Sequence, residues 1–386
     1  MPERVYLDWN ATTPLRPEAR LAMAAAWEIS GNPSSVHAEG RRARRLVEEA
    51  RAAVAAAIAA RPQDVIFSSG GTEANALALT PGLRRGAGPP VARLLVSAIE
   101  HASVLSGGRF SAEAIGTIGV RQSGLVDLDH LRTLLTDGPP ALVSVMLANN
   151  ETGAVQPVAE IAKIVHGADG LLHVDAIQGL GKISFDTNLV KADLVTLSAH
   201  KIGGPKGIGA MVLAEDVQGL EPLLRGGGQE LGRRAGTENV AGIAAFGAAA
   251  KAAMAALQDD AARLRGLRDR LEGGLKQTDG MMVFSQDVER LPNTTLFTVP
   301  GLKAETAVIG FDLAGIAVSS GSACSSGKVQ PSHVLGAMGF GPDIAQGAVR
   351  FSLGWSTREE DIDCAVEAWR KLGNTLLNGG ERRNTA

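Results

Sequence analysis

The sequence predicts an α/β fold with a mainly parallel sheet, helices on both of its faces, and a smaller α+β domain. Between residues 62 and 213, short apolar runs alternate with helix-forming stretches. Apolar runs without polar alternation are typical of strands buried on both faces, which form parallel sheets covered by helices. The expected strands are residues 65–68, 94–97, 142–147, 171–175, 194–197 and 210–213.

A second domain is expected because 386 residues are long for one domain. An Ala-rich helical region covers residues 243–275, and its charged, periodic second part predicts a bridge between domains. Beyond it, strands are expected at 294–299 and 316–319, and a closing helix at 358–377. We therefore expect a large domain over residues 15–258 and a small domain made of residues 1–14 and 259–386.

The composition of the chain is typical of a globular enzyme and disfavours binding to nucleic acid or to membranes. The chain is 45% hydrophobic and 20% charged, which is typical of a globular enzyme. Its formal net charge of −3 predicts no field that recruits nucleic acid or an anionic membrane, and the basic run at 41–45 is expected to be a solvated helix face. No membrane span or signal peptide is predicted, so a cytoplasmic location is expected. Two cysteines 40 residues apart predict neither a disulfide framework nor a metal site.

Asp175 ends the expected strand at 171–175, and Lys201 follows the expected strand at 194–197. Lys201 lies in a small Gly-rich turn, and lysine in such a place can form a Schiff base with pyridoxal phosphate (PLP). A solvated loop lysine is the alternative. Asp175 can keep a PLP pyridine nitrogen protonated, with Gln178 on the next turn. An aspartate that caps the following segment is the alternative.

A phosphate site is indicated at Gly70, Gly71 and Thr72, between an expected strand and a helix-forming stretch. Free backbone N–H groups and the helix dipole favour an anion there, although a plain strand-to-helix turn has the same pattern. The turn matches neither a P-loop nor a dinucleotide fingerprint, which disfavours ATP and NAD. His101 and Asn150 also follow expected strands. Ligands of such sheets bind beyond the carboxyl ends of the strands, so these residues are expected to share one site.

Taken in order, the motifs of the chain resemble those of the PLP-dependent cysteine desulfurases, in the class-V aminotransferase group. The resemblance runs almost from end to end and implies PLP fold type I. The matching motifs are residues 6–13 (YLDWNATT), 31–35 (GNPSS), 100–101 (EH), 149–153 (NNETG), 173–175 with 178, 198–201 (SAHK), 226–230 (GGGQE), 236–239 (GTEN), 319–326 (SSGSACSS) and 350–354 (RFSLG).

The resemblance implies roles around the PLP ring. Lys201 would hold PLP as a Schiff base and move protons, and Asp175 would pair with the ring nitrogen. Gln178 would contact the phenolic oxygen, and His101 would stack on the ring and move protons. Without the resemblance, His101 would be read as a satisfied loop histidine.

The resemblance also implies contacts to the phosphate and to the substrate. Thr72, Ser198 and His200 would bind the phosphate, and Thr237 would reach it from the partner subunit of a homodimer. Asn150 and Arg350 would hold the carboxylate of L-cysteine, for which arginine offers a planar fork. On its own, Arg350 would be read as a surface ion-pair residue.

The presence of Cys324 distinguishes a desulfurase from a transaminase, which does not need this cysteine. Its neighbours are small and polar and glycines flank the stretch, which suits an exposed, mobile thiol rather than a core cysteine. The resemblance implies that Cys324 takes the sulfur of L-cysteine as a persulfide, releases L-alanine, and passes the sulfur to an acceptor or an iron–sulfur scaffold protein. Cys364, within an expected helix, is expected to be structural.

Three residues depart from the pattern of the family: Trp9, Gly203 and Leu231. They leave the partner in doubt rather than the chemistry. The alternatives are another PLP reaction on the same fold (a selenocysteine lyase, a cysteine sulfinate lyase or a transaminase) and a catalytically degenerate binding subunit. Retention of Lys201 and Cys324 argues against the degenerate subunit.

Overall fold

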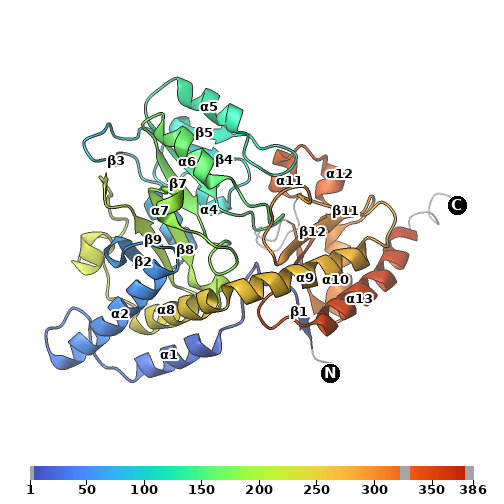
Figure 1. Ribbon diagram of the computed structural model, residues 1–386, viewed down its shortest axis with the longest axis horizontal. Coiled ribbons are helices and arrows are strands. Elements are labelled where there is room, and N and C mark those ends of the chain that lie inside the picture. The colour runs from blue at the N-terminus through green and yellow to red at the C-terminus, as the bar shows by residue number, and fades with distance from the viewer. Residues whose placement is uncertain (1–3, 322–330, 379–386) are drawn as a thin grey trace.

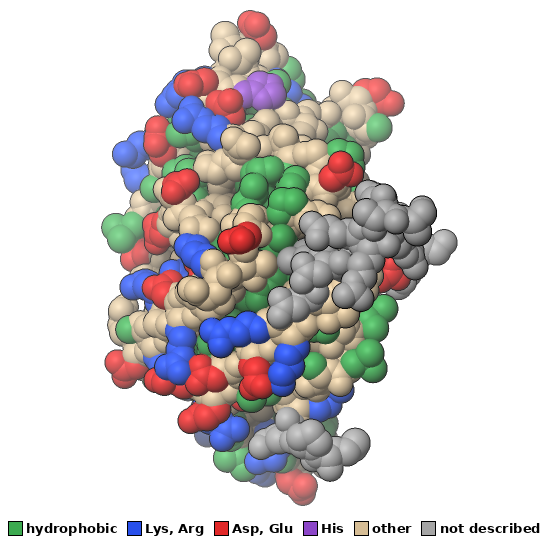
Figure 2. Space-filling view, turned by 90° about the vertical axis from the view of Figure 1, so that its right-hand side faces the viewer, with side chains coloured by type: hydrophobic (Ala, Val, Ile, Leu, Met, Phe, Trp, Pro, Cys, Tyr) green, Lys and Arg blue, Asp and Glu red, His purple; other side chains and the backbone are tan. Residues whose placement is uncertain are grey.

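The structure, a computed structural model, describes residues 4–321 and 331–378. Figure 1 shows a large part built on a wide sheet and a smaller part, drawn mainly in orange and red, beside it. Helix α9 (Leu257–Leu275) runs from one part to the other. Acidic and basic side chains are interspersed on the face shown in Figure 2, in keeping with the small net charge.

The large part is built on a seven-stranded sheet in the order β2-β9-β8-β7-β6-β4-β5. Strand β9 is antiparallel to both of its neighbours, and all other pairs are parallel. The expectation of a mainly parallel sheet is therefore confirmed. The strands are β2 (Val65–Ser68), β4 (Arg93–Ser97), β5 (Ile115–Ile118), β6 (Ala141–Met146), β7 (Leu171–Asp175), β8 (Leu194–Ser198) and β9 (Gly209–Leu213).

Both faces of this sheet are covered. Successive side chains of a strand point to opposite faces, and the neighbours Ile66 and Phe67 accordingly belong to two different apolar clusters. The cluster of Ile66 includes side chains of α3 and α4. The cluster of Phe67 includes side chains of α1, α2, α5, α6 and α8. The helices of the large part are α1 (Pro17–Trp27), α2 (Ala38–Ala56), α3 (Gly71–Ala78), α4 (Ala102–Leu105), α5 (Leu128–Thr136), α6 (Val158–His166), α7 (Thr187–Val190) and α8 (Val240–Ala255).

The smaller part is a four-stranded antiparallel sheet, β11-β12-β15-β14, covered by helices. The rings of its core pack against one another, in stacked and in edge-on pairs, and belong to Phe297, Phe311, Phe351 and Trp369. Its elements are β11 (Met282–Val283), β12 (Thr294–Thr298), α10 (Ala304–Leu313), β13 (Ile316–Ala317), β14 (Ser319–Ser320), α11 (His333–Ala337), α12 (Pro342–Ala345), β15 (Val349–Ser352) and α13 (Glu359–Asn378).

The N-terminal segment joins the two parts. Strand β1 (Val5–Tyr6) pairs with β13 of the smaller part, and residues 10–16 continue onto the turn after β8. The remaining elements are strands β3 (Arg84–Arg85) and β10 (Val217–Gln218), which pair with each other, and the 3-10 turns Pro62–Asp64, Ala112–Ala114, Ala199–Lys201 and Gln229–Gly232.

The helical region expected at 243–275 is two helices, α8 and α9, which meet at Ala256 with a bend of 69°. Helix α8 packs in the core of the large part and α9 in that of the smaller part. This break supports the division into domains 15–258 and 1–14 with 259–386, which we retain as a proposal. In the described part of the chain, no single helix is long and apolar enough to cross a membrane, and α8 with α9 meets the criterion only as a bent pair.

Candidate active site

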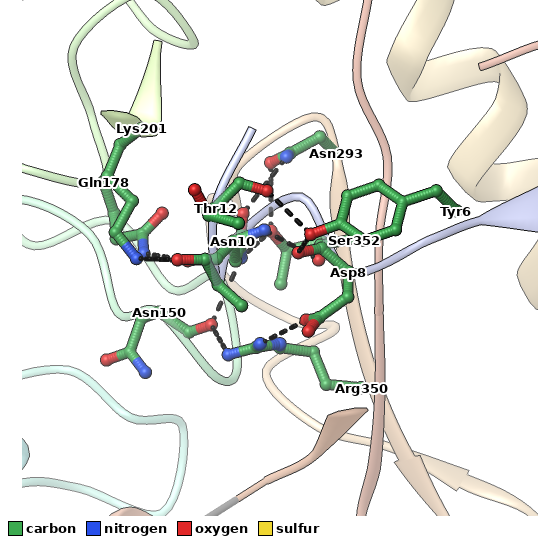
Figure 3. Close-up of polar contacts among 12 residues, drawn as sticks. Tyr6, Asp8, Asn10, Thr12, Asn150, Gln178, Lys201, Asn293, Arg350 and Ser352 are labelled. Atoms are coloured by element: carbon green, nitrogen blue, oxygen red, sulfur yellow. Dashed lines mark hydrogen bonds and ion pairs between the residues drawn. The ribbon is translucent and has the colours of Figure 1, made fainter. Parts of the chain in front are cut away.

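A cavity of about 290 Å³ lies at the carboxyl ends of the strands, between the two parts. It gathers ten of the residues singled out from the sequence: Gly71, Thr72, His101, Asn150, Asp175, Gln178, Ser198, His200, Lys201 and Arg350. Asn10 and Ala11 of the N-terminal segment complete one wall. Figure 3 shows Gln178 and Lys201 facing Asn10, with Asn150 and Arg350 beside it.

Lys201 enters the cavity from the 3-10 turn that follows β8. Its Nζ donates hydrogen bonds to the backbone oxygens of Asn10 at 2.6 Å and Ala11 at 2.8 Å. The segment that carries these oxygens is itself tied to the turn, because the backbone N–H of Thr13 donates to the oxygen of His200. The amine is therefore held in place by neutral acceptors, which leave it able to react with a carbonyl group.

Asp175 ends strand β7, which is parallel to and paired with β8. One carboxylate oxygen accepts from Asn75 Nδ2 at 2.9 Å and the other from the backbone N–H of Ile177 at 3.0 Å. Burial raises the pKa of Asp175, while those hydrogen bonds and the positive charges of His101 and Lys201 act to lower it. A buried carboxylate of this kind gains most from a cationic partner, which a protonated pyridine nitrogen would provide.

A chain of buried polar groups fixes Asn75 beneath this carboxylate. Ser144 contacts His173 Nδ1 at 2.8 Å, His173 Nε2 contacts Thr196 Oγ1 at 3.0 Å, and Thr196 donates to Asn75 Oδ1 at 2.6 Å. Burial lowers the pKa of His173 to about 3, so this imidazole is neutral at physiological pH. With its oxygen accepting from Thr196, the amide of Asn75 must present its nitrogen to Asp175.

His101 caps helix α4 and lines the cavity. Its Nδ1 accepts from the backbone N–H of Ser103 at 3.1 Å and contacts the hydroxyl of Ser103 at 2.8 Å. Burial lowers the pKa of His101; the positive charges of Lys201 and His333 act in the same direction, and the negative charge of Asp175 opposes them. An imidazole ring held in one orientation can stack on a planar ligand and exchange a proton at a ring nitrogen.

The turn before α3 fits a phosphate group. A Cβ at Gly71 would lie 2.3 Å from Cδ1 of Ile177, so the start of α3 has no room for a side chain at this position and lies close to Ser198. The hydroxyl oxygen of Ser198 is buried and has no hydrogen-bond partner among the described residues. His200, whose pKa burial lowers to about 4, contacts Thr12 at 3.1 Å. An unpartnered buried hydroxyl beside a helix N-terminus is the environment that a phosphate would satisfy, so these residues fit PLP.

Arg350 is buried on β15, across the cavity from Lys201. Its Nη2 forms an ion pair with Asp8 at 2.7 Å, and its Nη1 donates to the backbone oxygen of Asn150 at 3.0 Å. Its Nε is buried and has no partner among the described residues. Arg350 is therefore held in place rather than solvated, and two of the five N–H groups of its guanidinium have described acceptors.

Of the predicted site residues that the structure describes, Thr237 does not line this cavity. Thr237 is exposed and lines a separate hollow beside Gly236 and Asn239. Cys324 lies outside the described residues. Cys364 is exposed on α13, so the structural role expected for it is wrong.

Two of the departures from the family pattern, Trp9 and Gly203, lie next to the same residue, Trp355. Trp9 packs on Gly354 and against the edge of Trp355 at 4.6 Å between ring centroids. The guanidinium of Arg16 lies 4.1 Å over the ring of Trp355. A Cβ at Gly203 would approach both Arg16 and Trp355 to 2.5 Å. Glycine at 203 thus makes room for the aromatic cluster that Trp9 belongs to.

The third departure, Leu231, lies on the surface with 78% of its area exposed. Glu230 before it is buried and forms a bidentate pair with Arg51 at 2.7 and 2.8 Å. These residues line a larger cavity of about 450 Å³. That cavity is remote from Lys201, and its buried charges already satisfy each other, so it is a poorer candidate for chemistry.

The profile of the family described as Aminotransferase class-V matches residues 5–364. The chain belongs to this family. Its class-V aminotransferase relatives include a cysteine desulfurase of Cereibacter sphaeroides, 43% identical over 95% of this chain and 94% of that protein.

Solved structures show the same fold. A NifS-like protein from Rickettsia africae is 36% identical, with a TM-score of 0.87, over 96% of this chain and all of that one. SspA, solved in complex with cysteine, is 28% identical, with a TM-score of 0.74, over 90% of this chain and 98% of that one. Class-V aminotransferases are PLP enzymes of fold type I, so the family resemblance and the fold class expected from the sequence are confirmed.

Sequence reasoning missed three residues that hold the site together. Asn10 accepts from Lys201, Asn75 orients Asp175, and Lys182 donates to Gln178 at 2.6 Å. Asn10 lies within the N-terminal motif, which was a usable signal. Asn75 and Lys182 carry no comparable signal, because only the fold places them against the site.

Proposed function

We propose that this class-V aminotransferase family member is a PLP-dependent cysteine desulfurase, which converts L-cysteine to L-alanine and transfers the sulfur to Cys324 as a persulfide. The observation that carries the proposal is the meeting of Lys201, Asp175 and Arg350 in one cavity. These are an amine for a Schiff base, a carboxylate for a ring nitrogen and a guanidinium for an amino-acid carboxylate. The relative named cysteine desulfurase and the relative solved with cysteine support this substrate.

PLP, when bound, supplies an electron-withdrawing ring that stabilises negative charge at the Cα of the substrate. In the proposal, Lys201 Nζ bonds to it, Asp175 faces its ring nitrogen and Gln178 its phenolic oxygen. His101, which lines the cavity, would stack on the ring. The phosphate of PLP would be held by the N–H groups of the turn at Gly71, by the hydroxyls of Thr72 and Ser198, and by His200.

Substrate binding is assigned to Arg350 and Asn150. The ion pair with Asp8 fixes the guanidinium of Arg350, which lines the cavity. A carboxylate bound there would place the Cα of cysteine near Lys201, which removes its proton at Nζ. Charged hydrogen bonds of this kind also select an amino acid over an amine.

Sulfur transfer is assigned to Cys324. The Sγ of Cys324, as thiolate, attacks the sulfur of the substrate. The new S–S bond forms as the Cβ–S bond of the substrate breaks, and Cβ then takes up a proton. One cysteine and one thiol thus give one alanine and one persulfide, so the step needs no added oxidant or reductant.

The assembly and the acceptor are part of the proposal. Thr237 is exposed and lies apart from the cavity of its own chain, which supports a homodimer in which it reaches the phosphate of the partner subunit. The proposed acceptor of the persulfide sulfur is an iron–sulfur scaffold or another acceptor protein. A cytoplasmic location stays a prediction.

Cys324→Ala tests this function, with Cys364→Ala as the matched control on the exposed face of α13. Both proteins are purified with PLP and given L-cysteine, and absorbance, alanine and sulfide are followed. Cys324→Ala should still change its absorbance on binding cysteine but release essentially no alanine, while Cys364→Ala should match the wild type. Full sulfur release by Cys324→Ala would mean a lyase that expels sulfur directly. Cysteine turnover that requires an added 2-oxo acid and yields no alanine from the cysteine would mean a transaminase.

A further inference from the structure

A second lysine, Lys182, is buried beside the active site. It lies in the loop after β7 that also carries Gln178, and it is 9% exposed. Its Nζ donates to Gln178 Oε1 at 2.6 Å and to Asn10 Oδ1 at 2.9 Å. None of the steps proposed above uses it.

Lys182 is not there to neutralise a carboxylate. Among the described residues, no Asp or Glu forms an ion pair with it, and its two acceptors are both side-chain amides. Burial lowers the pKa of Lys182 well below its ordinary value, and the positive charges of Lys201 and Arg350 act in the same direction. Burying an amine near two other positive charges is unfavourable for folding. This cost points to a role for Lys182 in the site.

Lys182 and the backbone oxygen of Asn10 together determine how the amide of Gln178 is turned. The amine of Lys182 donates to the amide of Gln178, so the atom of Gln178 that faces it is the oxygen. The amide nitrogen is then on the other side, where it donates to the backbone oxygen of Asn10 at 2.9 Å. That oxygen also accepts from Lys201 Nζ at 2.6 Å. The nitrogen of Gln178 therefore faces the amine that forms the Schiff base.

We propose that Lys182 is a positioning residue, which holds the amide of Gln178 with its nitrogen, not its oxygen, toward the phenolic oxygen of the cofactor. This inference rests on the proposed function. A donor at that oxygen competes with the proton of the Schiff base formed by Lys201, and so favours loss of that proton. Without Lys182, the amide keeps only the hydrogen bond to the backbone oxygen of Asn10, so a turned amide, with its oxygen toward the phenolic oxygen, becomes more populated.

The test is a pH titration of the visible absorbance of the PLP-loaded protein. Lys182→Met keeps the length of the side chain and removes its donors. The apparent pKa of the Lys201 Schiff base should rise by about 0.5–1, as expected for the loss of one ordinary hydrogen bond. Lys163→Met, on the exposed side of α6, is the control and should leave it unchanged.

A double-mutant comparison shows whether Lys182 acts through Gln178. In a Gln178→Ala background, Lys182→Met should no longer shift the titration. A shift of undiminished size in that background would overturn the inference, because Lys182 would then act by its charge alone. Lys182→Gln, which can still donate to one of the two amide oxygens, should give a smaller shift in the same direction.

Two results separate this inference from the proposed function. If the wild type forms the Schiff base and Lys182→Met titrates as the wild type does, only the role of Lys182 is refuted. If the wild type forms no Schiff base with added PLP, the proposed function is refuted and this inference with it.

Discussion

Glu151, in the 149–153 motif, is a buried acid whose substitution should stabilise the protein at alkaline pH. Its side chain accepts from the hydroxyl of Ser332 at 2.5 Å, and the residue is 4% exposed. Burial raises the pKa of Glu151 from 4.5 to about 7, although the Ser332 hydrogen bond and the charge of Arg350 act to lower it. The folded protein therefore holds a proton on Glu151 that the unfolded chain has already lost at pH 6.

The sign and the size of the effect follow from this difference. Between pH 4.5 and about 7 the folded state binds more protons than the unfolded state, so the free energy of unfolding falls as the pH rises. At about 1.4 kcal/mol for each pKa unit, the loss amounts to about 3 kcal/mol and is complete above the folded pKa. Glu151→Gln has no proton to lose and keeps an oxygen that can accept from Ser332.

Thermal unfolding at pH 5 and pH 8 measures the effect, at one protein and PLP concentration. For a chain of this length, about 3 kcal/mol corresponds to roughly 4 °C in Tm, so Glu151→Gln should gain about that much on the wild type between the two pH values. Glu305→Gln, exposed on α10, is the control and should gain nothing. If the difference in Tm between Glu151→Gln and the wild type is the same at both pH values, the pKa of Glu151 is not raised.

Two further predictions concern the aromatic cluster and the substrate clamp. Gly203→Ala should lower the free energy of unfolding by about 1–3 kcal/mol, because Gly203 has a φ of +88° and the added Cβ would meet Arg16 and Trp355; unchanged denaturant unfolding would refute the packing described for Trp9. Arg350→Ala should weaken cysteine binding by about 10- to 150-fold, the value of a charged hydrogen bond, while PLP stays bound. Cysteine titrations followed by absorbance measure this, and an unchanged affinity would remove Arg350 from the clamp.

The central strands could be predicted because both of their faces are buried, which leaves an uninterrupted apolar run in the sequence. Strand β5 (Ile115–Ile118) was not predicted. It lies at the edge of the sheet and includes Gly116 and the exposed Thr117, so its residues do not form such a run. The bend between α8 and α9 was also missed, since Ala256 and Leu257 favour helix and only the two separate cores show that the helices diverge.

The candidate site was predictable where a residue ends a strand or closely follows one, as Asp175 and Lys201 do. In a parallel sheet, the carboxyl ends of the strands lie at the same edge. The residues that orient Asp175 and Lys201 were not predictable. Lys182 and Asn10 are hydrogen bonded across 172 positions of sequence, and Asn75 and Asp175 across 100. Contacts at such separations depend on the fold, and a lysine or asparagine in a loop has the same local pattern whether it is buried or solvated.

The central claim is that sulfur leaves L-cysteine by way of Cys324, and one measurement tests it most directly. The PLP-loaded wild type is mixed with L-cysteine in slight excess over active sites, without a reductant, and the products of the first turnover are quantified. The account predicts one alanine for each active site, little free sulfide, and one added sulfur atom on the peptide that contains Cys324, by mass spectrometry. Stoichiometric alanine with free sulfide and an unmodified Cys324 would contradict it.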